Sequence, residues 1–277
     1  MTATTEFVVP KSIPMILPIL FSSSLRYFRT RFSPIPLLKF SVLLSSFLAP
    51  VNAQSPNKEL LIAAASDLIA VQGPIVQAWA ALSDLKPRFT FGASGMLAQQ
   101  VSNGAPYDIF LSADEGRVKD LANGGHLLKD SVVEYARGRL GLWSRGRRAG
   151  AMGDLMGAGF KHIAIANPTH APYGVAAKQA VENSGLWSKI GPKIVYGETV
   201  RQALEYAESG NADAAIVAWS LVSDKGGVLL PSSLHSPIRQ NGGVVKTSQH
   251  QEEARYFLRF LISPEGKRLL ESHGFVK

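Results

Sequence analysis

The stretch LLIAAASDLIAVQGPIVQAWAAL (residues 60–82) sets a pattern that much of the chain repeats. Its first six residues form a continuous apolar run, which is typical of a strand buried in a parallel sheet. Ser66 and Asp67 then supply helix-capping side chains, and apolar residues recur at helical spacing as far as Leu82. The stretch therefore predicts a buried strand that leads directly into a helix.

The same alternation continues toward the C-terminus. Further short apolar runs predict strands at PRFTFGAS (87–94), YDIFLSAD (107–114), HIAIANP (162–168), KIVYG (193–197) and ADAAIVAWS (212–220). Helical patterns lie between them, and EEARYFLRFLISPEGKRLLESHG (252–274) predicts one long closing helix. Strands that alternate with helices indicate an α/β fold built on parallel sheet.

Composition excludes several classes of protein. The 277 residues are 46% hydrophobic and 18% charged, as in a folded globular chain, and there is no cysteine for a disulfide, a thiolate metal site or a lipid-modified N-terminus. The net charge of +8 divides equally, because residues 1–53 carry five basic groups and one acid (+4) and the remainder carries 24 basic and 20 acidic groups (+4). Bulk charge therefore does not favour nucleic acid as a partner.

The N-terminal region has the order of a secretory signal. A basic segment, RYFRTRF (26–32), precedes the apolar stretch LLKFSVLLSSFLAP (37–50), and small residues lead to a possible cleavage before Gln54. The apolar stretch is shorter than the ~20 residues that cross a bilayer. We expect residues 1–53 to be a signal segment that exports the chain to the periplasm; a retained membrane anchor is the alternative.

Four strand-to-helix turns offer hydroxyls or open backbone, at Ser66, at Ser94, at Tyr173 and at Glu198–Val200. None has a basic residue at the junction. Helix N-termini bind anions through free N–H groups and the positive end of the helix dipole. Because ligands in α/β folds bind at the carboxyl ends of strands, four such turns together would suit a small tetrahedral dianion.

Four segments together resemble the periplasmic molybdate-binding proteins, the soluble receptors of ABC-type molybdate importers. They are AAASDL (63–68), FGASGMLAQQVSNGAPYDIFLSAD (91–114), ANPTHAPYGVAAKQAV (166–181) and GETVRQALEYAESGNADAAIVAWSL (197–221). The resemblance implies a two-lobed periplasmic-binding-protein fold of type II, in which each lobe is a mainly parallel sheet flanked by helices. It implies lobes at 57–139 plus 235–277 and at 140–234.

The resemblance also implies a set of ligand-binding residues. The family holds its oxyanion with serine hydroxyls and main-chain amides, without a cation. Carried over by position, these are the hydroxyls of Ser66 and Ser94 and the amides of Tyr173 and Val200. Some members add a tyrosine hydroxyl where this chain has Ala218, which implies a larger contribution from Tyr173.

Asp67 is the fifth candidate and departs from an all-donor site. A carboxylate repels a dianion unless it points away as a charge at a helix N-terminus. If it faces the pocket, it can accept the proton of hydrogen phosphate, which a site made only of donors would reject. The serines also have a simpler interpretation, as N-caps worth about 1 kcal/mol each to stability.

From these residues we expect a receptor that captures molybdate and tungstate in the periplasm and delivers the oxyanion to a membrane permease. We expect a monomer that needs no cofactor, holds molybdenum only as the oxyanion and catalyses no reaction. A receptor for another oxyanion such as sulfate is the alternative. A hydrolase with Ser66 or Ser94 as nucleophile is disfavoured because no motif places a histidine beside either serine. An effector-binding module of a transcription regulator is disfavoured by the export signal.

Overall fold

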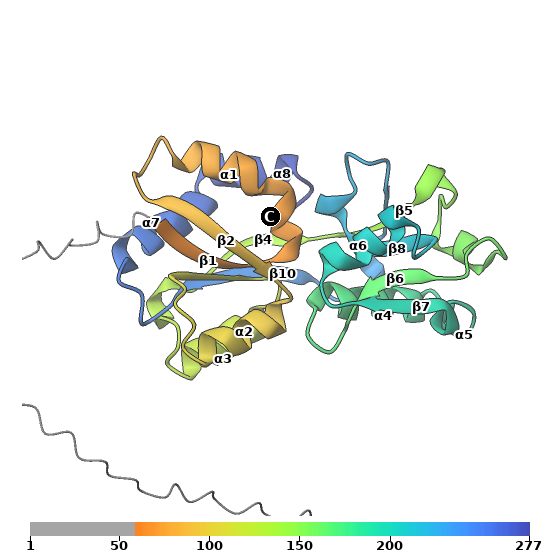
Figure 1. The fold of residues 1–277 in the computed structure, drawn as a ribbon, viewed down its shortest axis with the longest axis horizontal. Helices are drawn as coiled ribbons and strands as arrows, with labels where there is room; N and C mark the ends of the chain where they lie inside the picture. Colours follow the sequence, from red (N-terminus) through yellow and green to blue (C-terminus); the bar gives the residue numbers. More distant parts are fainter. Residues whose placement is uncertain (1–58) are drawn as a thin grey trace, which may run out of the picture. The chain divides into compact units, whose positions relative to one another are not determined.

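The computed structural model describes residues 59–277, which belong to one compact unit (Figure 1). The expected signal segment, residues 1–53, lies outside the described residues. Within the described part, no helix is long and apolar enough to cross a membrane.

The described chain alternates strands with helices, as the sequence predicts. The strands are β1 (Glu59–Ala65), β2 (Lys86–Gly92), β3 (Ile109–Ser112), β4 (Val133–Gly138), β5 (Leu140–Ser144), β6 (Ile163–Ala166), β7 (Ile194–Gly197), β8 (Ala214–Ala218), β9 (Val228–Leu229) and β10 (Ile238–Val244). The α-helices are α1 (Gln72–Trp79), α2 (Ser94–Ser102), α3 (Glu115–Asn123), α4 (Pro172–Asn183), α5 (Trp187–Ile190), α6 (Val200–Ser209), α7 (Gln251–Ile262) and α8 (Pro264–Ser272). Two 3₁₀ helices matter for the site, η1 (Ser66–Val71) and η6 (Trp219–Leu221).

Two five-stranded sheets organise the fold. The first has the order β2-β1-β3-β10-β4, with β1, β2 and β3 parallel and β10 antiparallel to both of its neighbours. The second has the order β7-β6-β8-β5-β9, with β6, β7 and β8 parallel and β5 antiparallel to both of its neighbours. We call the part built on the first sheet the first lobe and the part built on the second sheet the second lobe. The expected α/β class is therefore confirmed.

Helices cover both faces of each sheet, and separate apolar cores lie beneath them. In the first lobe, α1, α7 and α8 lie on one side of the sheet, and α2 and α3 lie on the other (Figure 1). Trp79 is fully buried there against the rings of Phe257 and Phe260, and its indole N–H donates to Leu85 O at 2.8 Å. In the second lobe, Ile163–Ala166 and Ala214–Ala218 are fully buried, because parallel strands are covered on both faces.

The chain passes from the first sheet to the second between β4 and β5, at Arg139, and returns between β9 and β10. The precise limits expected from the resemblance, 57–139 with 235–277 and 140–234, stay a prediction.

Two predicted helices differ from the observed ones, both because of proline. The expected long helix of residues 252–274 is wrong as a single element, since it breaks between α7 and α8 at Ser263. Pro264 has no N–H to continue α7; Ser263 is extended, and its hydroxyl accepts from Gly266 N at 3.2 Å to start α8. Likewise, the run after Asp67 begins as the 3₁₀ helix η1, and α1 starts only at Gln72, which places Pro74 in its first turn.

One glycine fixes how closely α4 approaches the end of β6. A Cβ built at Gly174 would lie 2.1 Å from Ala166 O, a backbone atom that cannot move without the strand. We predict that Gly174→Ala lowers the free energy of unfolding by about 1–3 kcal/mol, because overpacking must push the helix off the sheet. Denaturant titration measures this. Gly73→Ala is the control, since a Cβ there meets nothing within 4 Å and the helix gains alanine's propensity. Equal effects of the two substitutions would contradict the prediction.

Candidate functional site

A small cavity lies where the first-lobe elements after β1, β2 and β3 meet the starts of α4 and α6. All five candidate residues line it. The lining consists of Ala65, Ser66, Asp67, Gly92, Ala93, Ser94, Ala113, Ala171, Pro172, Tyr173 and Val200. None of these is basic, and Asp67 is the one acid among them. The sequence therefore brings its four strand-to-helix turns to one place, as expected from the carboxyl ends of strands.

The two serines are not N-caps in this structure. The N-cap positions of η1 and α2 are Ala65 and Ala93, and neither helix start has a side-chain cap hydrogen bond. The Ser94 hydroxyl instead accepts from Ala113 N at 3.1 Å and is nearly fully buried. Ser66 is equally buried at the first position of η1. The capping interpretation is therefore wrong for both, and each serine contributes to the wall of the cavity.

Tyr173 and Val200 reach the cavity from the second lobe because helices begin there. Pro172 opens α4, where its missing N–H costs nothing, and Tyr173 follows it. Val200 opens α6, and the Thr199 hydroxyl caps that helix by accepting from Gln202 N at 3.0 Å. The N-termini of α2, α4 and α6 thus converge on one cavity, and their free N–H groups and positive dipole ends favour an anion.

The structure is closed around this cavity. Gly95 N at the start of α2 donates to His170 O at 2.9 Å, and the Ser220 hydroxyl in η6 donates to Asp67 O at 3.0 Å. Both bonds join the two lobes. The cavity has a volume of only about 10 Å³, roughly one water-sized sphere. A tetrahedral oxyanion therefore needs the walls to move outward before it fits.

Asp67 is bound by both lobes at once. Its Oδ2 accepts from the Tyr173 hydroxyl of α4 at 3.0 Å and from Gln240 Nε2 of β10 at 2.7 Å. The Gln240 Oε1 in turn accepts from the Tyr135 hydroxyl of β4 at 3.0 Å. All four side chains are buried, whereas the Asp67 Oδ1 has no hydrogen-bond partner among the described residues. The carboxyl therefore lies in the first turn of η1, as expected for a charge at a helix N-terminus, but it is buried and bound by side chains from both lobes.

Burial governs the electrostatics of this group. Burial raises the pKa of the Asp67 carboxyl to about 7, because it disfavours the charged form. The hydrogen bonds from Tyr173, Gln240 and nearby backbone N–H groups lower the pKa, but by less. Burial, with the adjacent carboxyl, also raises the pKa of the Tyr173 and Tyr135 hydroxyls well above their usual value, so both remain donors. Asp67 is thus poised to change its charge near neutral pH.

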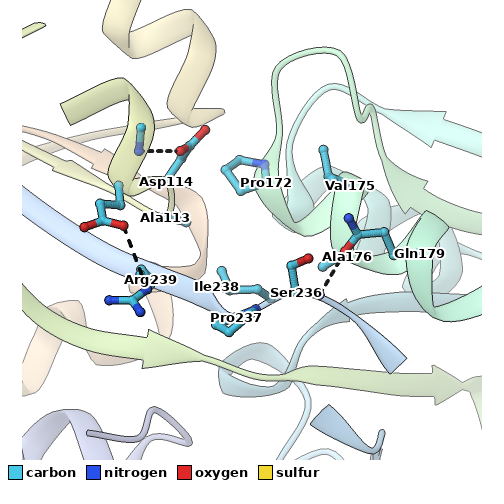
Figure 2. A pocket seen from close by; sticks show the side chains of 12 residues that line it. Ala113, Asp114, Pro172, Val175, Ala176, Gln179, Ser236, Pro237, Ile238 and Arg239 are labelled. Carbon is cyan, nitrogen blue, oxygen red and sulfur yellow. Dashed lines mark hydrogen bonds and ion pairs between the residues drawn. The ribbon is translucent and has the colours of Figure 1, made fainter. Parts of the chain in front are cut away.

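A larger pocket of about 330 Å³ adjoins the cavity and shares Ala113 and Pro172 with it (Figure 2). Its chemistry suits an anion less well. Asp114 and Glu115 bring carboxylates, and its one cation, Arg239, is paired with Glu134 at 3.0 Å and Glu115 at 3.8 Å. The smaller cavity is therefore the better candidate for an oxyanion.

Sequence reasoning missed three residues that support the cavity. Tyr135 and Gln240 lie on β4 and β10, far along the chain from Asp67, and no local motif marks either of them. Gly138 was also missed, although a Cβ there would lie 2.1 Å from the Tyr173 hydroxyl, so only glycine lets that hydroxyl reach Asp67. Gly138 ends the segment VEYARG, whose pattern gives no signal for this role.

Residues 60–276 match the family described as "Bacterial extracellular solute-binding protein". The molybdate-binding protein ModA of Rhodobacter capsulatus is 36% identical over 192 residues, which cover 68% of this chain and 76% of that protein.

Solved structures agree on the fold. The periplasmic molybdate-binding protein of Azotobacter vinelandii superposes with a TM-score of 0.74 at 31% identity, covering 79% of this chain and 99% of that one. The sulfate-binding protein SubI of Mycobacterium tuberculosis superposes with a TM-score of 0.64 at 15% identity, covering 78% and 86%, and so shares the fold alone. These matches confirm the two-lobed periplasmic-binding-protein fold.

The buried carboxyl predicts a pH dependence of stability. Because the pKa of Asp67 is about 7 when folded and near 4 when unfolded, the folded state binds the extra proton, so this group's stabilisation is full below pH 4 and is lost as pH rises through 7. Asp67→Asn keeps an acceptor for Tyr173 and Gln240 but cannot ionise. We predict that the unfolding free energy of the wild type falls relative to Asp67→Asn by roughly 2–3 kcal/mol between pH 5 and pH 8. Urea titrations at both pH values measure the difference, and parallel pH profiles would contradict it.

Proposed function

Because this chain belongs to the bacterial extracellular solute-binding proteins, in the group that contains the molybdate-binding proteins, we propose that it captures molybdate and delivers it to an ABC importer. The observation that carries the proposal is the cavity in which two serines and three helix N-termini converge without a cation. Tungstate, which has the same charge and nearly the same size, is proposed as a second ligand. Capture in the periplasm and release to a permease in the inner membrane complete the role.

We propose Ser66, Ser94, Tyr173 and Val200 as the donors to the oxyanion. The serines offer hydroxyls, while Tyr173 and Val200 offer backbone N–H groups in the first turns of α4 and α6. The Tyr173 hydroxyl is engaged with Asp67, so this residue serves through its backbone and through the contact between the lobes. Asp67 is the fifth member of the site, and its role is developed below.

The energetics suit a transport receptor. Each hydrogen bond to a charged oxygen is worth roughly 1.5–3 kcal/mol net, so six, counting the backbone N–H groups of Ser66 and Ser94 beside the four donors above, give roughly 9–18 kcal/mol. Association and closure oppose this by at least ~4 kcal/mol. The balance supports micromolar to nanomolar binding, about −8 to −12 kcal/mol. Neutral donors reach that range without a buried ion pair, and the ligand can still leave.

A binding role without catalysis fits the same observations. No histidine is among the residues that line the cavity, and the Ser94 hydroxyl contacts a backbone amide rather than a base. Nucleophilic hydrolysis needs a base within hydrogen-bond reach of the serine. The proposed activity likewise requires no cofactor, since the donors belong to the chain itself.

Calorimetric titration of the purified protein with molybdate, tungstate, sulfate and phosphate tests the proposal. We predict tight binding of molybdate and tungstate and much weaker binding of the smaller sulfate. Ser94→Ala should weaken molybdate binding about 10- to 150-fold, the value of one charge-assisted hydrogen bond. Ser102→Ala is the matched control, because this exposed serine ends the same helix and bonds only Gln99 O.

Two results would overturn the proposal. Sulfate binding as tight as molybdate would assign the chain to the transport of another oxyanion. No heat with any of the four anions, from a protein shown to be folded by its thermal unfolding transition, would exclude oxyanion capture.

A further inference from the structure

Asp67 leaves one oxygen unexplained in the wall of the cavity. Its Oδ2 accepts two hydrogen bonds, from Tyr173 and Gln240, whereas Oδ1 is buried and accepts no hydrogen bond of normal geometry among the described residues, although the N–H groups of Asp67 and Leu68 lie near the carboxyl. The residue is fully buried and lies beside Ser66, in the lining that it shares with Ser94. An unsatisfied buried carboxylate oxygen is costly, so this arrangement calls for a proton or a donor.

A tetrahedral dianion cannot be that donor. Its oxygens only accept hydrogen bonds, so an ionised carboxylate beside it adds repulsion and leaves Oδ1 unsatisfied. A protonated carboxyl reverses both effects, because it is neutral and its O–H becomes a further donor to the oxyanion. The Oδ2 contacts with Tyr173 and Gln240 are compatible with this form, since that oxygen still accepts.

Resting on the function proposed above, we propose that each molybdate bound takes up one proton from solution, which the Asp67 carboxyl holds and shares with the oxyanion. In this step the Asp67 carboxylate gains a proton from solution, and the resulting neutral carboxyl donates a hydrogen bond to the bound dianion. Asp67 is then a specificity-determining residue, because it makes the affinity for fully deprotonated oxyanions depend on pH.

Among the groups around Asp67, none competes with its carboxyl for the proton. Tyr173 of α4 and Tyr135 of β4 are its ionisable neighbours, and both stay protonated. Gln240 of β10 and Ser220 of η6 do not ionise, and α1 and α2 carry no ionisable side chains. The other ionisable groups near the lobe contact each lie beside a partner. Arg117 pairs with Asp114, His170 with Glu198, and Arg201 with Glu205 and Glu208.

The pH dependence follows directly. Burial places the pKa of the Asp67 carboxyl near 7 in the closed structure, and an adjacent dianion raises it further. Molybdate affinity should therefore be constant below pH 7 and fall about tenfold for each pH unit above it. Asp67→Asn keeps the same shape, with Oδ1 accepting from Tyr173 and Gln240 and the amide N–H₂ donating to the oxyanion. It should bind independently of pH and about tenfold more tightly than the wild type at pH 8.

Proton-linked calorimetry of the purified protein with sodium molybdate tests this. Titrations at pH 8 in two buffers of different ionisation enthalpy, HEPES and Tris, count the protons taken up per molybdate. We expect close to one for the wild type, none for Asp67→Asn and close to one for His170→Gln. At pH 5.5 the wild type should take up almost none, since Asp67 is already protonated.

The outcomes separate this inference from the proposed function. Molybdate binding by the wild type at pH 8 with no proton uptake would overturn the inference and leave the function standing. Equal uptake by wild type and Asp67→Asn, or loss of uptake in His170→Gln, would place the proton elsewhere and also overturn it. No binding by wild type or Asp67→Asn at either pH would overturn the proposed function, and the inference with it.

Discussion

The geometry of the site depends on the buried Asp67 carboxyl, which accepts hydrogen bonds from side chains of both lobes. Tyr173 reaches Asp67 from the second lobe, Gln240 reaches it from the first, and Ser220 binds its carbonyl oxygen. The Tyr173 and Ser220 contacts are lost if the lobes separate by more than about an ångström, because hydrogen bonds weaken steeply beyond their normal length, whereas the Gln240 contact lies within the first lobe. A buried group that loses its partners must regain water. Water is therefore excluded from the Asp67 carboxyl only while the two lobes are closed.

Small residues make such close contact possible. Four alanines, Ala65, Ala93, Ala113 and Ala171, line the cavity beside the serines. Their short side chains leave backbone N–H groups near the cavity, where a larger residue would cover them. Gly138 performs the same function for a side chain, since it clears the space that the Tyr173 hydroxyl occupies. Small side chains, and not basic residues, therefore allow the donors to lie close together around the cavity.

The sequence predicts the site where its information is local, and fails where it is not. Ser66, Ser94, Tyr173 and Val200 each lie at a strand-to-helix turn, so the alternation of apolar runs and helical patterns locates them, and parallel topology brings them together. The partners of Asp67 are different. Gln240 is 173 residues away along the chain and Tyr135 is on an edge strand, so their contact depends on how β10 inserts antiparallel between β3 and β4. No periodicity in the sequence indicates that insertion.

The break at Ser263 was predictable in principle, since Pro264 cannot continue a helix, but strong amphipathic patterns on both sides conceal it.

The way the lobes are joined fits a receptor that must open again. Among residues 59–277, every ion pair lies within one lobe, and none bridges the two. The contacts that do cross beside the cavity are hydrogen bonds, made by backbone groups, hydroxyls, the Asp67 carboxyl, the Gln240 amide and the Arg117 guanidinium, which donates to Thr169 O at 3.5 Å. Replacing a hydrogen bond between protein groups by bonds to water costs only roughly 1 kcal/mol net. Breaking a buried ion pair costs more, because it leaves a buried charge without a partner. The hydrogen bonds that join the lobes beside the cavity can therefore be replaced by bonds to water when the lobes part, at a modest cost for each.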